Sequence, residues 1–256
     1  MKKKVEGSRL AASYGYCDDD AQTKAELLQN PSLYWDVFYK ANKQNFFKDR
    51  HWLTREFPVL LTPDLVLCEL GCGVGNTVFP LLAENPSLRV HCSDFSATAV
   101  DILRGSPLFR PERVLTCCVA DCTNVEQVRA AHPAESSDAV ILIFVLSAMP
   151  PAQMRQVVQS CALVLRRGGR ALVRDYAHGD AAQIRFEQTP SSRQIDEHLC
   201  CRGDGTQAFF FPLDLFRALW EEAGFTTVEC VVRVTEAQAT GGRLRRFVQG
   251  QFEKNF

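Results

Sequence analysis

An apolar run followed at once by closely spaced glycines is the feature that most constrains how this chain can fold. Residues 65–70 form the apolar run, Gly71, Gly73 and Gly75 come directly after it, and residues 77–82 have apolar side chains at helical spacing. Glycine lets the backbone turn tightly and approach a ligand, and the amide groups at the start of the next helix point toward that ligand. The segment therefore predicts a strand, a ligand-binding turn and a helix.

Short apolar runs and amphipathic stretches alternate through the middle of the chain, which is typical of an α/β fold with a parallel sheet. Residues 139–145 are so continuously apolar that we expect this strand in the middle of the sheet. The helix that follows is expected to end on a glycine cap at Gly168 and Gly169. The predicted set comprises strands at 88–92, 114–119, 139–145 and 170–174, and helices at 97–103, capped by Ser96, and at 153–165.

After Asp175 the alternation of short apolar runs and amphipathic stretches becomes less regular. Residues 202–206, Arg-Gly-Asp-Gly-Thr, predict a hairpin turn because Asp-Gly accepts the positive φ that such turns need. A helix at 213–223 precedes strands at 226–234 and 243–252, which are too close in sequence for a crossover helix and should pair antiparallel. The predicted fold class is α/β, with a Rossmann-like, mostly parallel sheet and an antiparallel C-terminal edge hairpin.

Charge and length limit the partners of the chain. Lys and Arg number 29 against 30 Asp and Glu, so a polyanion must bind to a local basic patch. No run of about 20 apolar residues is present to cross a bilayer, and no signal peptide is found. We expect a cytoplasmic protein, with a nuclear location as the alternative; acidic residues near the start oppose a mitochondrial one. Residues 1–32 are predicted to be flexible and residues 33–256 to form one domain.

The cysteines predict neither a disulfide scaffold nor a metal site. Their number, 11, is odd, and without an export signal we expect reduced thiols. No Cys-x-x-Cys pair and no spaced pair of histidines is found, so no metal is predicted.

Acidic residues follow the next two predicted strands. Asp94 ends the second strand, about 19 residues beyond Gly75, where a carboxylate can accept both hydroxyls of a ribose. Asp121 follows the third strand in the same way, and the carboxyl ends of parallel strands meet in one crevice. The spacing Gly-x-Gly-x-Gly differs from the dinucleotide fingerprint, and the phosphate-loop lysine is missing, so a pyrophosphate ligand is disfavoured. The alternative for each Asp is a helix cap or turn residue.

The loop Glu-Leu-Gly-Cys-Gly-Val-Gly-Asn at 69–76, with Asp94, resembles the cofactor loop of seven-stranded S-adenosylmethionine-dependent methyltransferases. A more specific resemblance, over about residues 33–252, is to the tRNA 3-methylcytidine methyltransferases, which modify cytidine in the anticodon loop. It is carried by YWDVFYK at 34–40, NFFKDRHWLTREF at 45–57, DFS at 94–96, IFVLSA at 143–148 and VRDY at 173–176.

The resemblance implies S-adenosylmethionine as cofactor, S-adenosylhomocysteine as its product, and a helical N-terminal segment, residues 33–61, that caps the site. Phe95 and Ile143 could sandwich the adenine, while aromatic rings cover the sulfonium. The alternative for Trp35, Phe38 and Tyr39 is a helix face packed on the core. The implied cofactor contacts are Trp35, Tyr39, His51, Gly71, Gly73, Asp94, Phe95, Asp121, Cys122 and Ile143.

The implied reaction needs positioning more than proton removal. Ring nitrogen 3 of cytosine has a lone pair and no hydrogen, and positioning alone can contribute on the order of 7 to 11 kcal/mol. The product is cationic, so a carboxylate near the exocyclic amine could stabilise it. Asp175 is the best placed candidate, and the resemblance assigns it an essential role. The alternatives are an ion pair with Arg174 or a turn cap.

Base pairing hides nitrogen 3, so the target base must leave its stack, and cations must hold its phosphates. An exposed charge run is otherwise only solvated surface. The resemblance allows serine, threonine or arginine tRNAs as substrates and a partner such as seryl-tRNA synthetase. A small-molecule or protein methyltransferase on the same fold is the alternative. The predicted RNA contacts are Phe46, Phe47, Lys48, Arg50, Arg174, Tyr176, Arg245 and Arg246.

Overall fold

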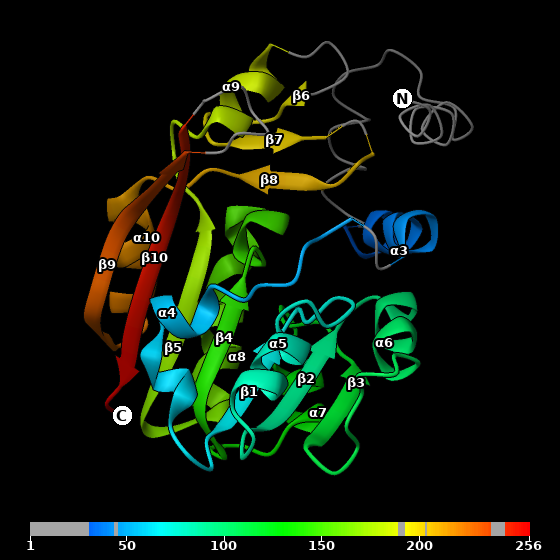
Figure 1. Ribbon diagram of the computed structural model, residues 1–256. Helices are drawn as coiled ribbons and strands as arrows, with labels where there is room; N and C mark the ends of the chain where they lie inside the picture. The colour runs from blue at the N-terminus through cyan, green and yellow to red at the C-terminus, as the bar shows by residue number, and fades with distance from the viewer. Residues whose placement is uncertain (1–30, 44–45, 189–192, 203, 237–243) are drawn as a thin grey trace.

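A seven-stranded sheet runs through the molecule in the order β3-β2-β1-β4-β5-β10-β9 (Figure 1). The computed structural model describes residues 31–43, 46–188, 193–202, 204–236 and 244–256. The predicted flexible region therefore lies almost wholly outside the described residues. Strands β1 to β5 are parallel to one another. Their bounds are β1 Val66–Leu70, β2 Arg89–Asp94, β3 Val114–Val119, β4 Ser137–Ile143 and β5 Leu165–Tyr176.

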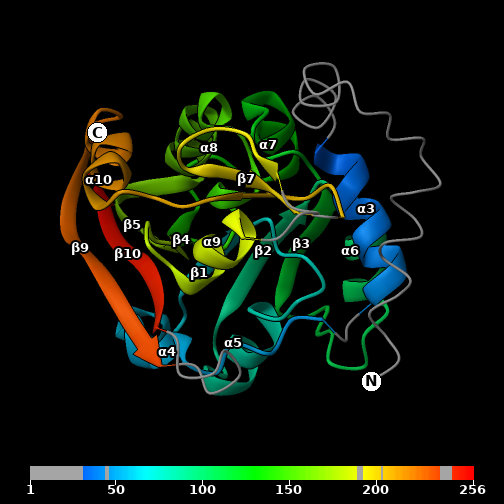
Figure 2. The same cartoon turned by 90° about the horizontal axis from the view of Figure 1, so that it is seen from above.

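Helices cover both faces of the sheet (Figure 2). One face packs on α7 (Val125–Ala131), α8 (Pro151–Val164) and α10 (Leu213–Glu221), and the other packs on α4 (Leu53–Glu56), α5 (Val78–Glu84) and α6 (Ala97–Arg104). A short 3-10 helix, η1 (Pro58–Leu61), follows α4, and another, η2 (Leu146–Ala148), follows β4. Alternate side chains of the strands enter separate hydrophobic cores on the two faces. The predicted α/β architecture is confirmed.

The sequence placed most of these elements correctly, but the strand predicted at 139–145 ends at Ile143, and the predicted end of α8 is wrong. β4 lies in the middle of the sheet, and the Ser96 hydroxyl caps α6 by accepting a hydrogen bond of 3.2 Å from the Ala99 amide. The glycine cap expected at Gly168 and Gly169 is wrong, because α8 ends at Val164 and both glycines belong to β5. The backbone becomes extended at Leu165, and the buried side chain of this residue packs in the core.

The C-terminal edge is the predicted antiparallel hairpin. β10 (Leu244–Lys254) pairs antiparallel with both β5 and β9 (Phe225–Glu236). Phe247 of β10 lies opposite Tyr176 of β5. Because β10 lies between β5 and β9, the edge strand on this side of the sheet is β9.

A small three-stranded sheet lies above the carboxyl ends of the parallel strands, beside α3 (Pro31–Asn42) (Figures 1 and 2). It contains β6 (Arg193–Gln194), β7 (Leu199–Cys201) and β8 (Gln207–Phe209), preceded by α9 (Ala181–Glu187). The turn expected at 202–206 joins β7 to β8, and Gly205 has a φ of +83°. A Cβ atom on Gly205 would overlap the Tyr34 ring, so the hairpin packs tightly on α3. Within the described ranges, no helix is long and apolar enough to span a membrane.

Candidate active site

Two adjoining hollows open over the carboxyl ends of the parallel strands. One, with a volume of about 850 Å³ including solvent at its mouth, is lined by Asp94 and Asp121, and we name it the acidic hollow. The other, about 490 Å³ on the same measure, is lined by Arg50 and Arg202, and we name it the basic hollow. The walls common to both hollows are Trp35, Tyr39, Gly71, Phe144 and Ala148.

The glycine turn after β1 has no room for a side chain at Gly71 or at Gly73. Gly71 has a φ of +78°, and a Cβ atom there would lie 2.7 Å from a methyl carbon of Val145. Gly73 has a φ of +52°, and a Cβ atom there would lie 2.7 Å from the Tyr39 hydroxyl oxygen. Any larger residue would be strained and would clash, so the predicted tight turn is confirmed.

Asp94 ties the glycine turn to the start of α6. Its Oδ2 accepts a hydrogen bond of 2.8 Å from the Gly73 amide, and its Oδ1 accepts one of 2.9 Å from the Ser96 amide. The side chain is buried, with 4% of the residue exposed, and this burial raises the pKa of Asp94 to about 6. Asp94 therefore stands ionised at neutral pH on the wall of the acidic hollow.

The acidic hollow also contains most of the other predicted cofactor contacts. Phe95, Asp121 and Cys122 line it, and Oδ1 of Asp121 accepts hydrogen bonds of 2.8 Å from the amide and hydroxyl of Thr123. Ile143 lines the basic hollow instead. Phe95 and Ile143 thus line different hollows that share walls, and their role in holding the adenine stays a prediction.

The aromatic stripe of α3 caps both hollows and is also packed on the core. Trp35 and Tyr39 line the two hollows, while Phe38 packs beside them in a cluster with Val74 and Ala99. The two predicted alternatives, a site wall and a packed helix face, are therefore both true of this helix.

The structure does not bring His51 to the site. Its side chain is 70% exposed, and Nδ1 lies 3.4 Å from Oε1 of Glu84 at the far end of α5. The preceding residue, Arg50, is tied inward by its amide, which donates to the Asn76 carbonyl. We infer that His51 faces outward because its neighbour faces inward.

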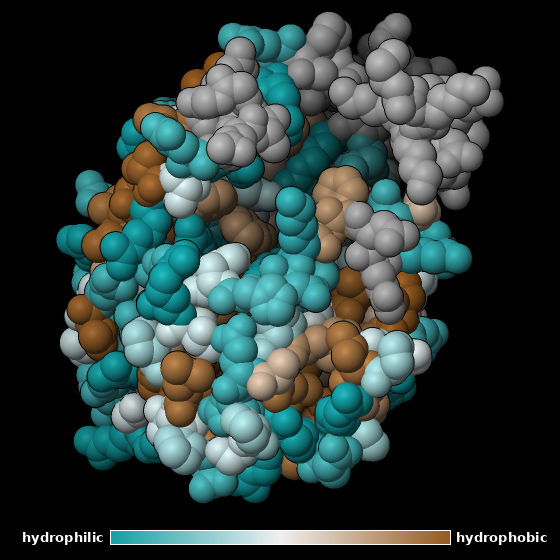
Figure 3. Space-filling view, in the orientation of Figure 1, coloured by the Kyte–Doolittle hydropathy of each residue, from teal (hydrophilic) through white to brown (hydrophobic). Residues whose placement is uncertain are grey.

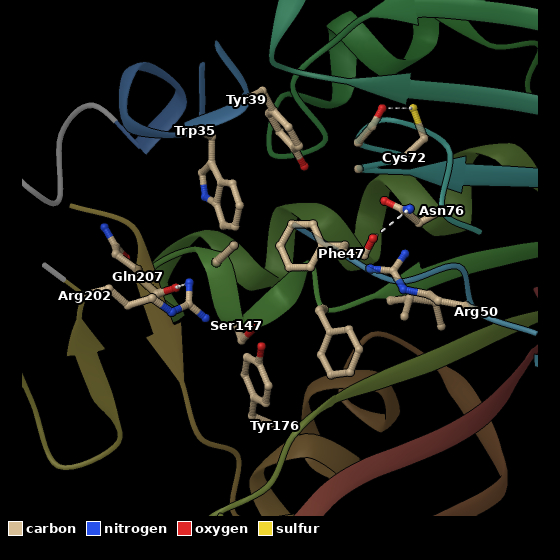
Figure 4. A pocket seen from close by; sticks show the side chains of 15 residues that line it. Trp35, Tyr39, Phe47, Arg50, Cys72, Asn76, Ser147, Tyr176, Arg202 and Gln207 are labelled. Atoms are coloured by element: carbon tan, nitrogen blue, oxygen red, sulfur yellow. Dashed lines mark hydrogen bonds between the residues drawn. The ribbon is translucent and has the colours of Figure 1, made fainter. Parts of the chain in front are cut away.

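Two arginines stand on opposite sides of the basic hollow (Figure 4). Arg50 donates a hydrogen bond of 2.7 Å from Nη1 to the Thr77 hydroxyl, and its guanidinium carbon lies 5.7 Å from the Phe144 ring centroid. Arg202 is held by the β7–β8 turn, where Nη1 donates to the Thr206 hydroxyl at 3.0 Å and to the Gln207 carbonyl at 3.1 Å. Both positive charges are thus fixed in place by local hydrogen bonds.

Glu69, the acidic residue that precedes the glycines, is buried close to Arg50. Its carboxylate is fully buried, which raises the pKa of Glu69 to about 8, while the Arg50 charge opposes the rise.

Phe144 is the wall residue that sequence reasoning missed most clearly. β4 ends at Ile143, and Phe144 adopts a left-handed φ of +61°, which turns the chain out of the sheet. Its ring centroid lies 5.0 Å from that of Tyr176. The apolar run 139–145 carries no local signal for this turn. Other wall residues of the basic hollow that were not predicted are Cys72, Asn76, Ser147, Ala148, Arg202 and Gln207.

Asp175 lies behind the wall of the basic hollow and does not line it. The residue is 0% exposed, its Oδ2 accepts a hydrogen bond of 2.9 Å from the Ser147 amide, and its Oδ1 accepts one of 2.9 Å from the Tyr176 amide. Burial raises the pKa of Asp175 to about 6. Asp175 therefore positions two residues of the wall, and its catalytic role stays a prediction.

The alternative of an ion pair between Asp175 and Arg174 is wrong. Successive side chains of a strand point to opposite faces, and Arg174 pairs with Glu56 at 3.9 Å on the other face. Its guanidinium carbon also lies 4.3 Å from the Trp52 ring centroid.

The predicted RNA contacts are spread over a wider surface. Phe47 and Tyr176 line the basic hollow, whereas Phe46 is 57% exposed and packs edge-on against Phe38 and Phe47. Lys48 is exposed. Arg245 and Arg246 lie near the start of β10, where Nε of Arg245 binds Asp180 at 2.9 Å.

The acidic hollow fits S-adenosylmethionine on three grounds. Its glycine turn leaves no room for a side chain, the carboxyl groups of Asp94 and Asp121 line it as acidic groups suited to a cationic ligand, and aromatic rings form part of its wall. With the strand order of the sheet, these features define an S-adenosylmethionine-dependent methyltransferase. A sequence model described as "Methyltransferase domain" matches residues 68–171.

Comparison with known proteins gives the family. The human tRNA N(3)-cytidine methyltransferase METTL6 is 39% identical, over 97% of this chain and 88% of that protein. The mouse protein of that name is 42% identical, over 86% and 79%. A Drosophila melanogaster tRNA N(3)-methylcytidine methyltransferase, Mettl2, is 36% identical, over 92% and 75%. This chain belongs to the tRNA N(3)-cytidine methyltransferase family.

Solved structures agree on the fold. An S-adenosylmethionine-dependent methyltransferase from Anabaena variabilis superposes with a TM-score of 0.63 at 15% identity, covering 88% of this chain and 95% of that one. A Burkholderia thailandensis N1-methyltransferase of didemethyltoxoflavin with bound S-adenosylhomocysteine gives 0.55 at 14% identity, covering 94% and 92%.

Proposed function

We propose that this protein methylates ring nitrogen 3 of a cytidine in the anticodon loop of a subset of tRNAs, using S-adenosylmethionine. The observation that carries the proposal is the pair of adjoining hollows, one lined by carboxylates and the other by arginines and aromatic rings. A sulfonium cofactor suits the first, and a base carried on a phosphate backbone suits the second. Family membership supports the same reaction.

The residues of the basic hollow act by holding the base. When bound, S-adenosylmethionine supplies an electrophilic methyl group. Tyr176, Phe144 and Phe47 offer ring faces on which an unstacked pyrimidine can lie. Arg50 and Arg202 offer donors to the oxygen of the base or to its phosphates. No side chain needs to remove a proton from ring nitrogen 3 before transfer.

Asp175 supports this geometry from behind the wall. With a pKa of about 6 it is largely ionised at pH 7, and its buried charge favours the cation that forms when the base is methylated. Its hydrogen bonds also fix the backbone of Ser147 and Tyr176 at the edge of the basic hollow. Asp175 thus acts on the base through charge and through position.

We extend the proposal to serine, threonine or arginine tRNAs, with seryl-tRNA synthetase as a partner and the cytoplasm as the location. A Saccharomyces cerevisiae relative, 37% identical over 77% of this chain and 32% of its own length, is named tRNA(Thr) (cytosine(32)-N(3))-methyltransferase. Purified individual tRNAs, each tested with and without seryl-tRNA synthetase, give the subset and the partner. Immunofluorescence of the tagged chain gives the location.

The decisive experiment uses the purified chain, S-adenosylmethionine labelled in the methyl group, and total tRNA. We expect the label in 3-methylcytidine after digestion of the tRNA to nucleosides, and much less label with the Asp94→Ala variant when the cofactor is below its saturating concentration. Label in protein or in small metabolites, with none in RNA, contradicts the proposal and supports the alternative methyltransferase class.

A further inference from the structure

A hollow that holds cytosine and rejects uracil needs a hydrogen-bond acceptor at a defined place. The edge of cytosine that carries ring nitrogen 3 also carries an exocyclic amine, which donates hydrogen bonds. Uracil has a carbonyl oxygen in place of that amine, and this oxygen only accepts them. An acceptor that faces this position therefore favours cytosine over uracil.

The arginines of the basic hollow cannot supply this acceptor, because a guanidinium group has donors only. The surface is hollowed between the small three-stranded sheet and the seven-stranded sheet, and hydrophilic and hydrophobic side chains intermingle there (Figure 3). The acceptor must come from a neutral side chain of the wall that contains an oxygen atom. Side chains of this kind are Tyr39, Asn76, Ser147, Tyr176 and Gln207.

Ser147 differs from the other candidates because a buried carboxylate holds it in place. It lies in η2, after the left-handed turn at Phe144, and it lines the basic hollow together with Tyr176 and Arg202 (Figure 4). Its amide donates a hydrogen bond of 2.9 Å to Oδ2 of Asp175. Only 2% of the residue is exposed, so bulk water competes little for its hydroxyl group.

The hydroxyl group of Ser147 is bound to Asp175 as well. Burial raises the pKa of Asp175 to about 6, and hydrogen bonds from the hydroxyl and the amide of Ser147 oppose this rise. An ionised carboxylate accepts hydrogen bonds and donates none, so the hydroxyl hydrogen of Ser147 points toward Asp175. The lone pairs of the Ser147 oxygen are then left for a donor in the hollow.

We propose that Ser147 determines the choice of base: its hydroxyl oxygen accepts a hydrogen bond from the exocyclic amine of the target cytidine, while Asp175 holds the hydroxyl hydrogen away from the base. The inference rests on the proposed function and deepens it by naming the group that rejects uridine. A uridine would place its carbonyl oxygen against the lone pairs of Ser147, with no hydrogen between the two oxygens. Asp175 is a positioning residue in this arrangement, because it acts on the base through Ser147.

The test compares three forms of one tRNA that the unaltered enzyme methylates. The target position carries cytidine, uridine, or the 2-pyrimidinone ribonucleoside, which is cytidine without its exocyclic amine. Dissociation constants are measured by gel shift with S-adenosylhomocysteine bound, so that no methyl transfer occurs. We expect the unaltered enzyme to bind each altered RNA roughly 5- to 150-fold more weakly, the range for a buried polar group left without its partner. Because this arm needs no substitution, it does not depend on how a variant folds.

Ser147→Ala should remove the preference for cytidine. This variant should bind the cytidine RNA more weakly by a similar factor and should bind all three RNAs within about twofold of one another, because the acceptor is already lost. Affinity for S-adenosylhomocysteine should stay unchanged, since Ser147 does not line the acidic hollow. Ser160→Ala, which removes another buried serine hydroxyl from α8, is the matched control and should keep the preference of the unaltered enzyme.

Three results separate the possible failures. If the unaltered enzyme binds the three RNAs equally, nothing in the hollow reads the amine and the role of Ser147 is refuted. If Ser147→Ala keeps the full preference, another acceptor such as Gln207 reads the amine, and the role of Ser147 is again refuted. In both cases the proposed function stands as long as the unaltered enzyme forms 3-methylcytidine in intact tRNA. If it forms none, the proposed function and the inference are both refuted.

Discussion

The acidic hollow and the basic hollow share walls but differ in charge. Trp35, Tyr39 and Phe144 belong to both, whereas carboxylates line only the first and arginines only the second. A sulfonium cofactor is a cation and RNA is a polyanion, so the charge of each hollow favours one ligand and disfavours the other. The two ligands can therefore bind side by side, in contact where the hollows adjoin, without competing for the same site.

The hollows also differ in how the chain builds them. The lining of the acidic hollow includes the residues that directly follow β2 and β3, together with residues from α3, the glycine turn and the segment after β4. The basic hollow combines Arg50, Phe144, Tyr176 and Arg202, which are far apart in sequence. The first therefore depends partly on local turns, whereas the second depends mainly on the packing of distant segments.

Asp175→Asn should produce the largest effect and separate the hollows most clearly. The amide keeps the shape but loses the charge and one acceptor, so we expect kcat to fall by about 100-fold or more. Affinity for S-adenosylhomocysteine should stay unchanged, because Asp175 does not contact the acidic hollow. Single-turnover methylation of tRNA and calorimetric titration of S-adenosylhomocysteine check the two halves. Full activity of the variant would show that Asp175 has no part in the reaction.

Asp94→Ala should give the converse result. Losing a carboxylate that binds the Gly73 and Ser96 amides and faces the ligand should weaken S-adenosylhomocysteine roughly 10- to 100-fold. Gel-shift affinity for tRNA should not change. Asp101→Ala, an exposed residue of α6, is the matched control. Unchanged cofactor affinity in Asp94→Ala would contradict the assignment of the acidic hollow.

Trp35→Ala should affect ligand binding in both hollows, because the Trp35 ring lines both. Loss of one aromatic wall should weaken S-adenosylhomocysteine and tRNA each by roughly fivefold, and Trp35→Phe should recover most of both losses. Calorimetry and gel shift on the same preparations measure the two affinities, and thermal unfolding tests whether the fold is intact. An effect on one ligand alone would show that the hollows do not share this wall in solution.

The smallest expected effect is a dependence of cofactor affinity on pH. The pKa of Asp94 is raised to about 6, so lowering the pH through 6 protonates the carboxylate that the cofactor needs. Affinity for S-adenosylhomocysteine should then be about fourfold lower at pH 5.5 than at pH 7, as expected for one titrating group. Calorimetric titrations at both values, repeated with Asp94→Asn, check this. The Asn variant should show no such dependence; a dependence that persists would belong to another group.

The sequence by itself determined the sheet and the local turns that contribute to the acidic hollow. Strand ends, the glycine turn and Asp94 are set by periodicity and by backbone needs that act over a few residues, as at Gly71, which has no room for a side chain. Only the tertiary structure decided the rest. It turned His51 to solvent, placed Asp175 behind Ser147 and Tyr176, and turned the chain at Phe144 toward both hollows. The direction of such a side chain depends on segments that pack against it from elsewhere in the chain, and no local pattern encodes that packing.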